Sequence, residues 1–333
     1  MSDRPTLAEV AAEAGVSPAT ASRALNGSAH VTPATRRRVD AAVARLGYVR
    51  RRSVYARPGR QTQRVVAAAI CEPLPYALVN PFHIRLLTTA EQVLADAGAS
   101  LVVVPSPGPA AVRTLLTGAF GGVLLIGASD RHPVAISLAA SGLPVRCAGR
   151  SPEGARLPYV DVDNNDGARQ AARHLVRSGR RRVAVIAGPR ALPAVRDRLD
   201  GFLDTLADAG MVDVPVAFGD FTYSSGMYAM RWLLDRASDV DAVFAVADTM
   251  AVGAVDMLRR AGRHVPDDVA AVGFDDAPFA KRMTPALTTV RQPIEDLTTR
   301  AVRLLLADMA ERDAHAHDGN PTLPTELIVR ESA

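Results

Sequence analysis

Residues 17–26 combine one guanidinium group with several short hydroxyl and amide side chains. Arg23 can offer two parallel N–H groups to a guanine edge, which is worth about 1–3 kcal/mol of discrimination between bases. Ser17, Ser22 and Asn26 are of the kind that hydrogen-bond to phosphates and so position a protein without reading sequence. This chemistry is that of a nucleic-acid surface, provided that the chain presents these residues on an element that fits a groove.

The surrounding segment predicts three short helices. A cap precedes each of them and satisfies its free backbone N–H groups: Thr6 in a capping box with Glu9, Ser17 followed by Pro18, and Thr32 followed by Pro33. The first helix is expected to end at Gly15, which suits the left-handed conformation, and the second to run to residues 26–27. The third has one apolar face, because its apolar residues recur at i, i+4 and i+7: Val39, Val43 and Leu46.

Two helices joined by the tight turn 14–17, with a third to bury their apolar faces, have the helix-turn-helix arrangement. There the second helix enters the major groove by its N-terminal residues, so Ala19, Thr20 and Arg23 are candidates to face base edges. Thr6 is a further candidate phosphate contact, because helix N-termini favour anions. A generic three-helix bundle can carry the same caps.

The distribution of charge favours the nucleic-acid interpretation. Residues 1–60 contain 11 arginines and four acids, a net of +7, whereas the remaining residues contain 28 basic and 31 acidic side chains, a net of −3. A basic segment on a mildly acidic body predicts that the segment meets a polyanion and the body does not.

Composition and length predict a globular chain of two or three compact units. The 333 residues are 48% hydrophobic and 22% charged, which is enough apolar material for real cores. No apolar run reaches about 18 residues, and the first residues have no apolar stretch typical of a secretory signal. We therefore expect a cytoplasmic protein without a membrane partner.

The later sequence alternates apolar strands with helical stretches. Strands are predicted at 64–70, 100–104, 122–126, 143–148, 183–187, 242–247 and 269–273. Such alternation is typical of a doubly wound α/β fold with ligands at the carboxyl ends of its parallel strands. A division near residue 160 predicts two lobes with a cleft between them, and residues 288–293 are expected to return the chain to the first lobe.

Motifs of covalent or phosphate chemistry are absent. The sequence has no GxGxxG, no GxxxxGK[ST], no HExxH and no GxSxG. Cys71 and Cys147 lie in predicted strands and are expected to be core residues, and His315 with His317 lies in a polar stretch that does not predict a metal site. We expect no catalytic residues, no metal and no cofactor.

With these residues in view, the first 48 residues resemble the head of the lactose/galactose-repressor family nearly position for position, from Thr6 through Tyr48. The resemblance implies that Pro18 and Ala19 are specificity positions and that Arg23 and His30 contact DNA. It also implies a homodimer that binds double-stranded DNA at a pseudo-palindromic operator.

The connector after Tyr48 departs from the family pattern. The family has a hinge helix whose leucine enters the minor groove, whereas here Arg57 stands at that position and Pro58–Gly59 would end a helix. The arginines of this segment either draw the linker into the groove electrostatically or form a solvated basic tether. Arg57 is the candidate contact.

The body resembles the periplasmic-sugar-binding-protein fold of the same family, so that the likeness covers about 320 residues. The resemblance implies that Arg198 and Asp275 grip neighbouring hydroxyls and that Phe221 stacks on a sugar ring. Asp166 and Gln292 would add polar contacts, and Phe82 would close the cleft from the first lobe. Such a site suits a sugar-like effector. From the residues alone, Arg198 can equally cap a helix and Phe221 can lie in a core.

Two departures from the family pattern affect which ligand is expected. Ala247 and Ala194 replace hydrogen-bonding residues of relatives, which favours a less hydroxylated compound. Three rival classes fit less well: an enzyme lacks its motifs, a transport binding protein would need a secretory signal, and an architectural DNA-binding protein would not need such a body.

The sequence therefore predicts an effector-controlled transcriptional regulator, by family default a repressor. Its expected parts are a DNA-binding domain at 1–48, a basic linker at 49–63 and an effector-binding body at 64–333. In that body the first lobe would comprise about 64–160 plus 291–325, and the second about 161–290.

Overall fold

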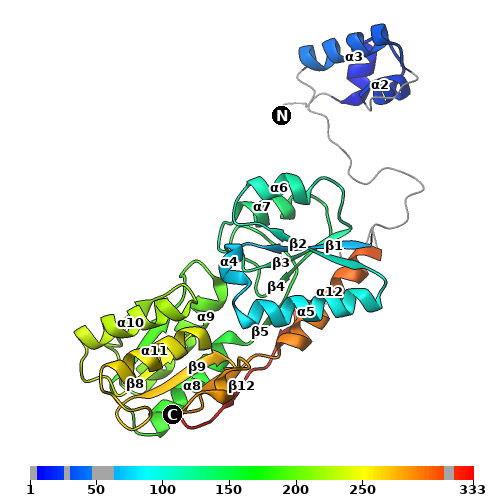
Figure 1. Cartoon of the computed structure of the whole chain (residues 1–333). Helices are drawn as coiled ribbons and strands as arrows, with labels where there is room; N and C mark the ends of the chain where they lie inside the picture. Colours follow the sequence, from blue (N-terminus) through cyan, green and yellow to red (C-terminus); the bar gives the residue numbers. More distant parts are fainter. Residues whose placement is uncertain (1–5, 26–30, 47–63, 311–318) are drawn as a thin grey trace. The chain divides into compact units, whose positions relative to one another are not determined.

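The computed structural model describes residues 6–25, 31–46, 64–310 and 319–333 (Figure 1). The chain divides into two compact units between Pro58 and Gly59. We call residues 6–46 the head and residues 64–333 the body. Within the head, the side chains of Ala19, Ser22 and Arg23 are among those outside the description. No helix in the described ranges is long and apolar enough to cross a lipid bilayer.

The head has the three predicted helices, α1 (Leu7–Glu13), α2 (Pro18–Leu25) and α3 (Pro33–Leu46). The predicted caps are confirmed. Thr6 and Glu9 form a capping box, the Ser17 hydroxyl accepts from the Thr20 N–H at 3.1 Å, and Gly15 has a φ of +62°. The turn between α1 and α2 therefore follows from local hydrogen bonding and one left-handed glycine.

One face of α2 packs against the other two helices of the head. Ala21 and Ala24 are buried with Val10 and Val39 in the head's core. At 3.6 residues per turn, positions 19, 22 and 23 lie on the opposite side of the helix. The turn itself is held from α3, where the Arg38 guanidinium donates to the carbonyl oxygens of Ala14 and Gly15.

The first lobe of the body is built on a parallel six-stranded sheet in the order β11-β5-β4-β3-β1-β2. Its strands are β1 (Val65–Ile70), β2 (Ser100–Pro105), β3 (Gly122–Ile126), β4 (Val145–Ala148), β5 (Tyr159–Val162) and β11 (Thr322–Leu323). Helices α5 (Pro81–Asp96) and α12 (Ile294–Ala310) pack on one face, preceded by the short α4 (Leu74–Ala77). Helices α6 (Ala110–Leu115) and α7 (Pro133–Ala139) pack on the other.

The second lobe repeats this plan in a sheet of order β12-β10-β9-β8-β6-β7. Its strands are β6 (Val183–Ala187), β7 (Val216–Phe218), β8 (Ala242–Ala245), β9 (Ala270–Asp275), β10 (Thr288–Arg291) and β12 (Glu326–Ile328), the last antiparallel to β10. Around it lie α8 (Asn164–Arg177), α9 (Pro193–Asp208), α10 (Tyr223–Arg236), α11 (Asp248–Arg260) and the 3-10 turn η1 (Ala280–Arg282). The predicted α/β class, with a helix-turn-helix head and two doubly wound parallel sheets, is confirmed.

Three connections join the lobes. The chain crosses between β5 and α8 and returns between β10 and α12, as the pattern near 160 and at 288–293 predicts. It then crosses a third time, between β11 and β12, so the final residues belong to the second sheet. Sequence reasoning missed this third crossing because both strands are very short.

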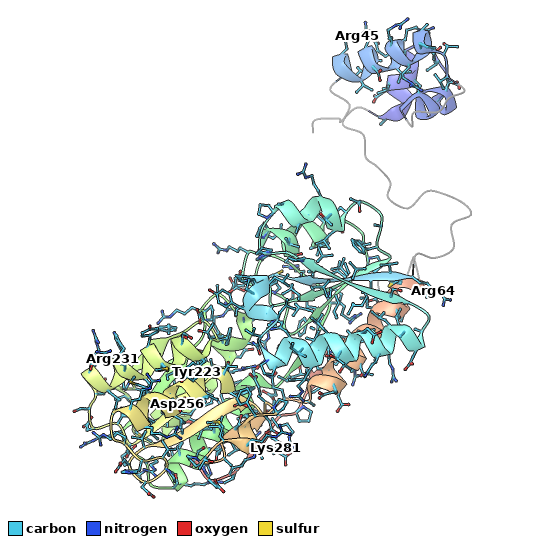
Figure 2. All side chains as sticks on the ribbon, viewed as in Figure 1. Arg45, Arg64, Tyr223, Arg231, Asp256 and Lys281 are labelled. Atoms are coloured by element: carbon cyan, nitrogen blue, oxygen red, sulfur yellow. The ribbon has the colours of Figure 1, made fainter. Side chains whose placement is uncertain are left out.

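Helices α10 and α11 approach each other closely at two glycines, where no side chain separates the backbones. A Cβ atom on Gly226 would lie 2.2 Å from the carbonyl oxygen of Met250, and one on Gly253 would lie 2.1 Å from that of Tyr223. The hydroxyl of Tyr223 donates to Asp256 across the same helix pair at 2.7 Å (Figure 2). The pair packs backbone to backbone, which a methyl group would prevent.

We therefore expect Gly226→Ala to lower the free energy of unfolding of the body by about 3 kcal/mol, because the new methyl must push α11 away. Urea denaturation checks this. Gly108→Ala is the matched control, since a Cβ there meets nothing within 4 Å, and it should unfold like the wild type. Equal stability of both variants would contradict the close packing.

Candidate functional site

The carboxyl ends of the two sheets face each other across the body. Asp130, which follows β3, donates its N–H to the carbonyl oxygen of Ala191, which follows β6, at 2.8 Å, and its carboxylate pairs with Arg196 of α9. Arg150, which follows β4, lies 3.0 Å from Asp197 of α9. Loops at the carboxyl edge of one lobe thus contact the other, and this is where doubly wound sheets bind ligands.

A buried guanidinium stands at the second lobe's side of this junction. Arg198 is 7% exposed; its Nε donates to Asn164 Oδ1 at 2.8 Å and its Nη1 to the carbonyl oxygen of Val246 at 2.6 Å. Its guanidinium lies 3.7 Å above the Phe274 ring, a cation–π contact. Arg198 is therefore held in one orientation by its surroundings.

Asp275, at the end of β9, lies beside this arginine. Its Oδ1 is 3.6 Å from Arg198 Nη1 and accepts a hydrogen bond from Gln292 Nε2. Burial raises the pKa of Asp275 to about 6, while Arg198 and Gln292 act to lower it. The structure thus brings together three residues proposed from the sequence, Arg198, Asp275 and Gln292, in one buried polar cluster.

Phe221 lies on the same carboxyl edge, shortly after β7. It has a φ of +67°, a conformation that L side chains adopt rarely and at some cost. The Thr249 hydroxyl donates to its carbonyl oxygen at 2.7 Å, and its ring lies so near Gly188 that a Cβ there would be 2.8 Å away. Phe221 is partly buried against the second lobe's core.

Phe82 lies in the first turn of α5, in the other lobe. It is partly buried against the first lobe's core, with its ring edge-on to His83 at 5.4 Å between centroids. Asn80 caps the helix by accepting from the Phe82 N–H at 3.0 Å. The cap fixes the residue at the start of the helix.

Asp166 is not brought to this cluster. It accepts from Gln170 at 2.8 Å and lies 3.8 Å from Arg173, with its side chain 48% exposed. Asn164, two positions earlier, instead contacts Arg198. Asp163 caps α8, so Asn164 is the first residue of the helix and Asp166 is the third. The side chain of Asn164, not that of Asp166, reaches the cluster.

Sequence reasoning also missed polar residues that follow the other strands. Asp161, 2% exposed near the end of β5, accepts from Asn164 at 3.2 Å and lies 3.7 Å from Arg150. Burial raises the pKa of Asp161 to about 6. Arg150 pairs in turn with Asp197. Arg150 could have been proposed from the sequence, because it lies just after a predicted strand.

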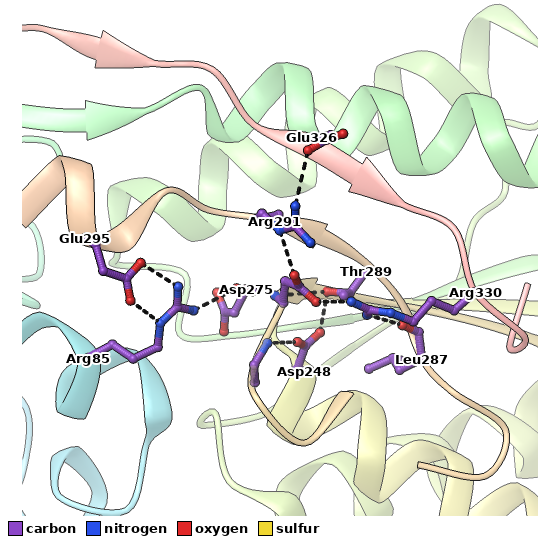
Figure 3. A network of polar contacts seen from close by, with 11 residues as sticks. Arg85, Asp248, Asp275, Leu287, Thr289, Arg291, Glu295, Glu326 and Arg330 are labelled. Carbon is purple, nitrogen blue, oxygen red and sulfur yellow. Dashed lines mark hydrogen bonds and ion pairs between the residues drawn. The ribbon is translucent and has the colours of Figure 1, made fainter. Parts of the chain in front are cut away.

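A second network ties the end of β9 to its neighbours (Figure 3). The fully buried Asp248 accepts from the Ala277 N–H at 2.7 Å and from Thr289, and burial, with Asp275 nearby, raises its pKa. Arg85 of α5 makes two hydrogen bonds to Glu295 at 2.8 and 2.7 Å and donates to the Asp275 carbonyl oxygen at 3.5 Å. The first lobe thus reaches the segment that carries Asp275.

In the head, two proposed DNA contacts also serve the helix caps. Thr6 and Ser17 accept from backbone N–H groups, and the Thr20 hydroxyl lies 2.9 Å from that of Ser17. Pro18 is exposed at the start of α2. Other predictions lie outside the described residues: Asn26, His30 and Arg57, the side chains of Ala19, Ser22 and Arg23, and His315 with His317. Among the described residues, no group of three His, Cys, Asp or Glu could hold a metal ion.

Both parts of the chain match known protein families. Residues 6–51 match bacterial regulatory proteins of the lacI family, and residues 172–333 match the periplasmic binding protein-like domain. The HTH-type transcriptional regulator CelR of Thermobifida fusca is 40% identical over 340 residues, which cover 99% of this chain and 98% of that protein.

Solved structures of transcriptional regulators are also similar to this chain over nearly its whole length. A transcriptional regulator CelR–cellobiose complex has a TM-score of 0.78 at 39% identity, covering 99% of this chain and all of that one. The lac repressor dimer bound to operator and the anti-inducer ONPF has a TM-score of 0.71 at 27% identity, covering 99% of both chains.

A helix-turn-helix head joined to a two-lobed body of this topology defines a DNA-binding transcriptional regulator. The chain belongs to the lacI family of bacterial regulatory proteins, as the sequence resemblance implies.

Proposed function

We propose that the protein is a cytoplasmic repressor that binds a pseudo-palindromic operator as a homodimer and is controlled by a sugar-like effector held between the two lobes. Residues 1–48 would bind DNA, 49–63 would link, and 64–333 would bind the effector. The observation that carries the proposal is the buried Arg198–Asp275 cluster on a body fused to a helix-turn-helix. We assign no catalytic role to the protein.

On the DNA side, the proposal rests on the geometry of α2. Because Ala21 and Ala24 pack inward, helical geometry puts positions 19, 22 and 23 on the opposite face of α2, and we propose that this face meets base edges. Thr6, Ser17 and Thr20 stand at helix N-termini, where backbone N–H groups favour phosphate oxygens. The remaining proposed contacts are Pro18, Asn26, His30 and Arg57.

On the effector side, the cluster supplies both donors and acceptors. Arg198 and Asp275 are oriented by their partners, and Phe221 offers an aromatic face on the same edge. Asn164 and Asp161 add polar groups that offset the loss expected from Ala194 and Ala247. We therefore infer a hydroxylated ligand, and cellobiose, present in the CelR complex, is the first compound to test.

The homodimer is supported by apolar side chains exposed on the first lobe. Those on the surface of the edge strand β2 and around the start of α5 are Leu78, Val79, Ile84, Val102 and Val103. An apolar surface of this kind is typical of a protein interface. The lac repressor of similar fold is a dimer on its operator.

Control would act through the closure of the lobes. The pairs Asp130–Arg196 and Arg150–Asp197 join the carboxyl edges of the two sheets, so a ligand between them changes which contacts the lobes make. The effector can shift operator affinity only by its difference in affinity for the two closure states, typically 1–3 kcal/mol.

Selection of duplexes from a random pool by the full-length protein tests the proposal. We expect a palindromic consensus whose isolated half-site binds more weakly, and an operator affinity that cellobiose changes by roughly 5- to 150-fold. Recovery of no consensus sequence would contradict the regulator assignment. A consensus without any response to cellobiose would contradict only the choice of ligand.

A further inference from the structure

The segment that carries Asp275 is held in a conformation that L residues rarely adopt. Asp275, the last residue of β9, has a φ of +119°, and Asp276, directly after it, has a φ of +49°. Two consecutive side-chain-bearing residues in this region strain the backbone, and such strain persists only where neighbouring groups hold the chain in place. The direction in which Asp275 presents its carboxylate to Arg198 therefore depends on what anchors Asp276.

Two arginines anchor the Asp276 carboxylate, one on each oxygen. Arg330 Nη2 donates to Oδ1 at 2.5 Å, and Arg291 Nε donates to Oδ2 at 2.7 Å. Burial acts to raise the pKa of Asp276, but the hydrogen bonds from Arg330 and Arg291 outweigh it and lower the pKa below the usual value for aspartate. The carboxylate is therefore charged at neutral pH, and hydrogen bonds between charged groups of this kind are the stronger ones.

Arg330 is the better fixed of the two anchors. It lies two residues past β12, its side chain is 15% exposed, and its Nη1 donates to the carbonyl oxygen of Leu287 at 2.8 Å (Figure 3). The Arg291 side chain is 47% exposed, and its other partner is Glu326 at 3.5 Å. Loss of Arg330 would therefore release Asp276 more completely than loss of Arg291.

Arg330 lies outside the cluster proposed to bind the effector. Its described side-chain hydrogen bonds go to Asp276 and Leu287, and neither partner belongs to the Arg198–Asp275 cluster. Binding groups work only when the residues around them hold their geometry. The guanidinium can act on a ligand at that cluster only through Asp276, which adjoins Asp275 in the chain.

We propose that Arg330 is a positioning residue of the effector site. By holding the Asp276 carboxylate, it keeps residues 275–276 in the strained conformation that directs the Asp275 carboxylate toward Arg198, and it thereby sets the affinity for the effector without touching it. This inference rests on the proposed function, because it assumes that Asp275 binds the effector.

Calorimetric titration of full-length variants with cellobiose tests it. We expect two single variants to bind cellobiose at least about 10-fold more weakly than the wild type, the effect of one lost hydrogen bond to a charged group. Arg330→Met removes the guanidinium and keeps the aliphatic stem, and Asp276→Asn removes the charge and keeps the shape. Because both act through one contact, the double variant should match the weaker single variant within about 2-fold. Losses that multiply in the double variant would overturn the inference.

The matched control is Arg180→Met. Arg180 donates to the carbonyl oxygens of Asp241 and Pro266 at 3.2 and 2.7 Å. These carbonyls lie near the amino ends of β8 and β9 in the same lobe, at the edge of the sheet opposite to the effector cluster. The variant should bind cellobiose like the wild type even where thermal unfolding shows that it is less stable.

Thermal unfolding of each variant separates positioning from stability. If Arg330 only stabilises the fold, Arg330→Met should melt at a lower temperature and bind cellobiose with wild-type affinity, and that result would overturn the inference. Asp275→Asn tells the inference apart from the proposed function. If it weakens binding while Arg330→Met and Asp276→Asn do not, the inference alone fails. If Asp275→Asn binds normally, or the wild type does not bind cellobiose, the proposed saccharide site fails and the inference fails with it.

Discussion

Replacing Asp275 with asparagine is expected to weaken cellobiose binding by about 10- to 100-fold, the cost of losing hydrogen bonds to a charged acceptor, and so to abolish the response of operator binding. The carboxylate is held between Arg198 and Gln292 at the carboxyl edge of the second sheet, so the variant changes its charge and little else. Operator affinity in the absence of effector should stay at its wild-type value. Calorimetry with cellobiose and fluorescence anisotropy with labelled operator measure the two effects.

The raised pKa of Asp275 also predicts how the stability of the fold depends on pH. Because the folded pKa of Asp275 is raised to about 6, above the usual value for aspartate, the ionised carboxyl destabilises the fold. This penalty is full above pH 6 and is relieved as the pH falls below it. Asp275→Asn removes this titrating group, so the stability of the variant should fall less than that of the wild type as the pH rises through 6.

The matched control is Asp166→Asn, the same substitution at a half-exposed aspartate that the structure keeps apart from the cluster. It should retain the effector response. A normal response in Asp275→Asn, or its loss in Asp166→Asn, would contradict the placement of the site.

Operator affinity is expected to fall at least 1,000-fold between about 50 and 200 mM salt, as for proteins that make 6–10 phosphate contacts. The 11 arginines of residues 1–60 are the source of this dependence, since the rest of the chain carries a net charge of −3. Not all of them are free for phosphates: Arg38 holds the α1–α2 turn and Arg45 pairs with Glu13 at 3.2 Å.

Anisotropy titrations across a salt series measure the slope. Cellobiose affinity over the same series serves as the internal control, because a neutral ligand releases no counterions and should respond weakly. A nearly flat operator curve would mean that the basic segment does not contact the backbone, and the DNA-binding assignment of the head would lose its electrostatic basis.

The parts predicted correctly from the sequence are those governed by neighbouring residues. The caps at Thr6, Ser17 and Thr32 were predictable because a hydroxyl and the N–H three residues later meet whenever the chain turns into a helix. Long apolar runs such as β3 and β6 were located within their observed bounds. Strands β5, β7, β10, β11 and β12 were not predicted, because two to four residues carry little periodic signal.

The functional residues were harder to choose than the elements. Arg198, Asp275 and Gln292 were identified through resemblance to a family, and the structure groups them. Asp166 was predicted and Asn164 was not considered, because the sequence does not show which face of α8 turns toward Arg198.

The sequence by itself determined the three capped helices, the alternation of strands and helices, the charge of the first 60 residues and the family, because these depend on local hydrogen bonding, periodicity and composition. Only the tertiary structure decided which polar side chains meet. The loops that follow parallel strands are brought together by the sheet and by three crossings between lobes, and burial then sets the charge state of residues such as Asp161, His83 and Asp275. Desolvation depends on everything packed around a group, which no stretch of neighbouring residues contains.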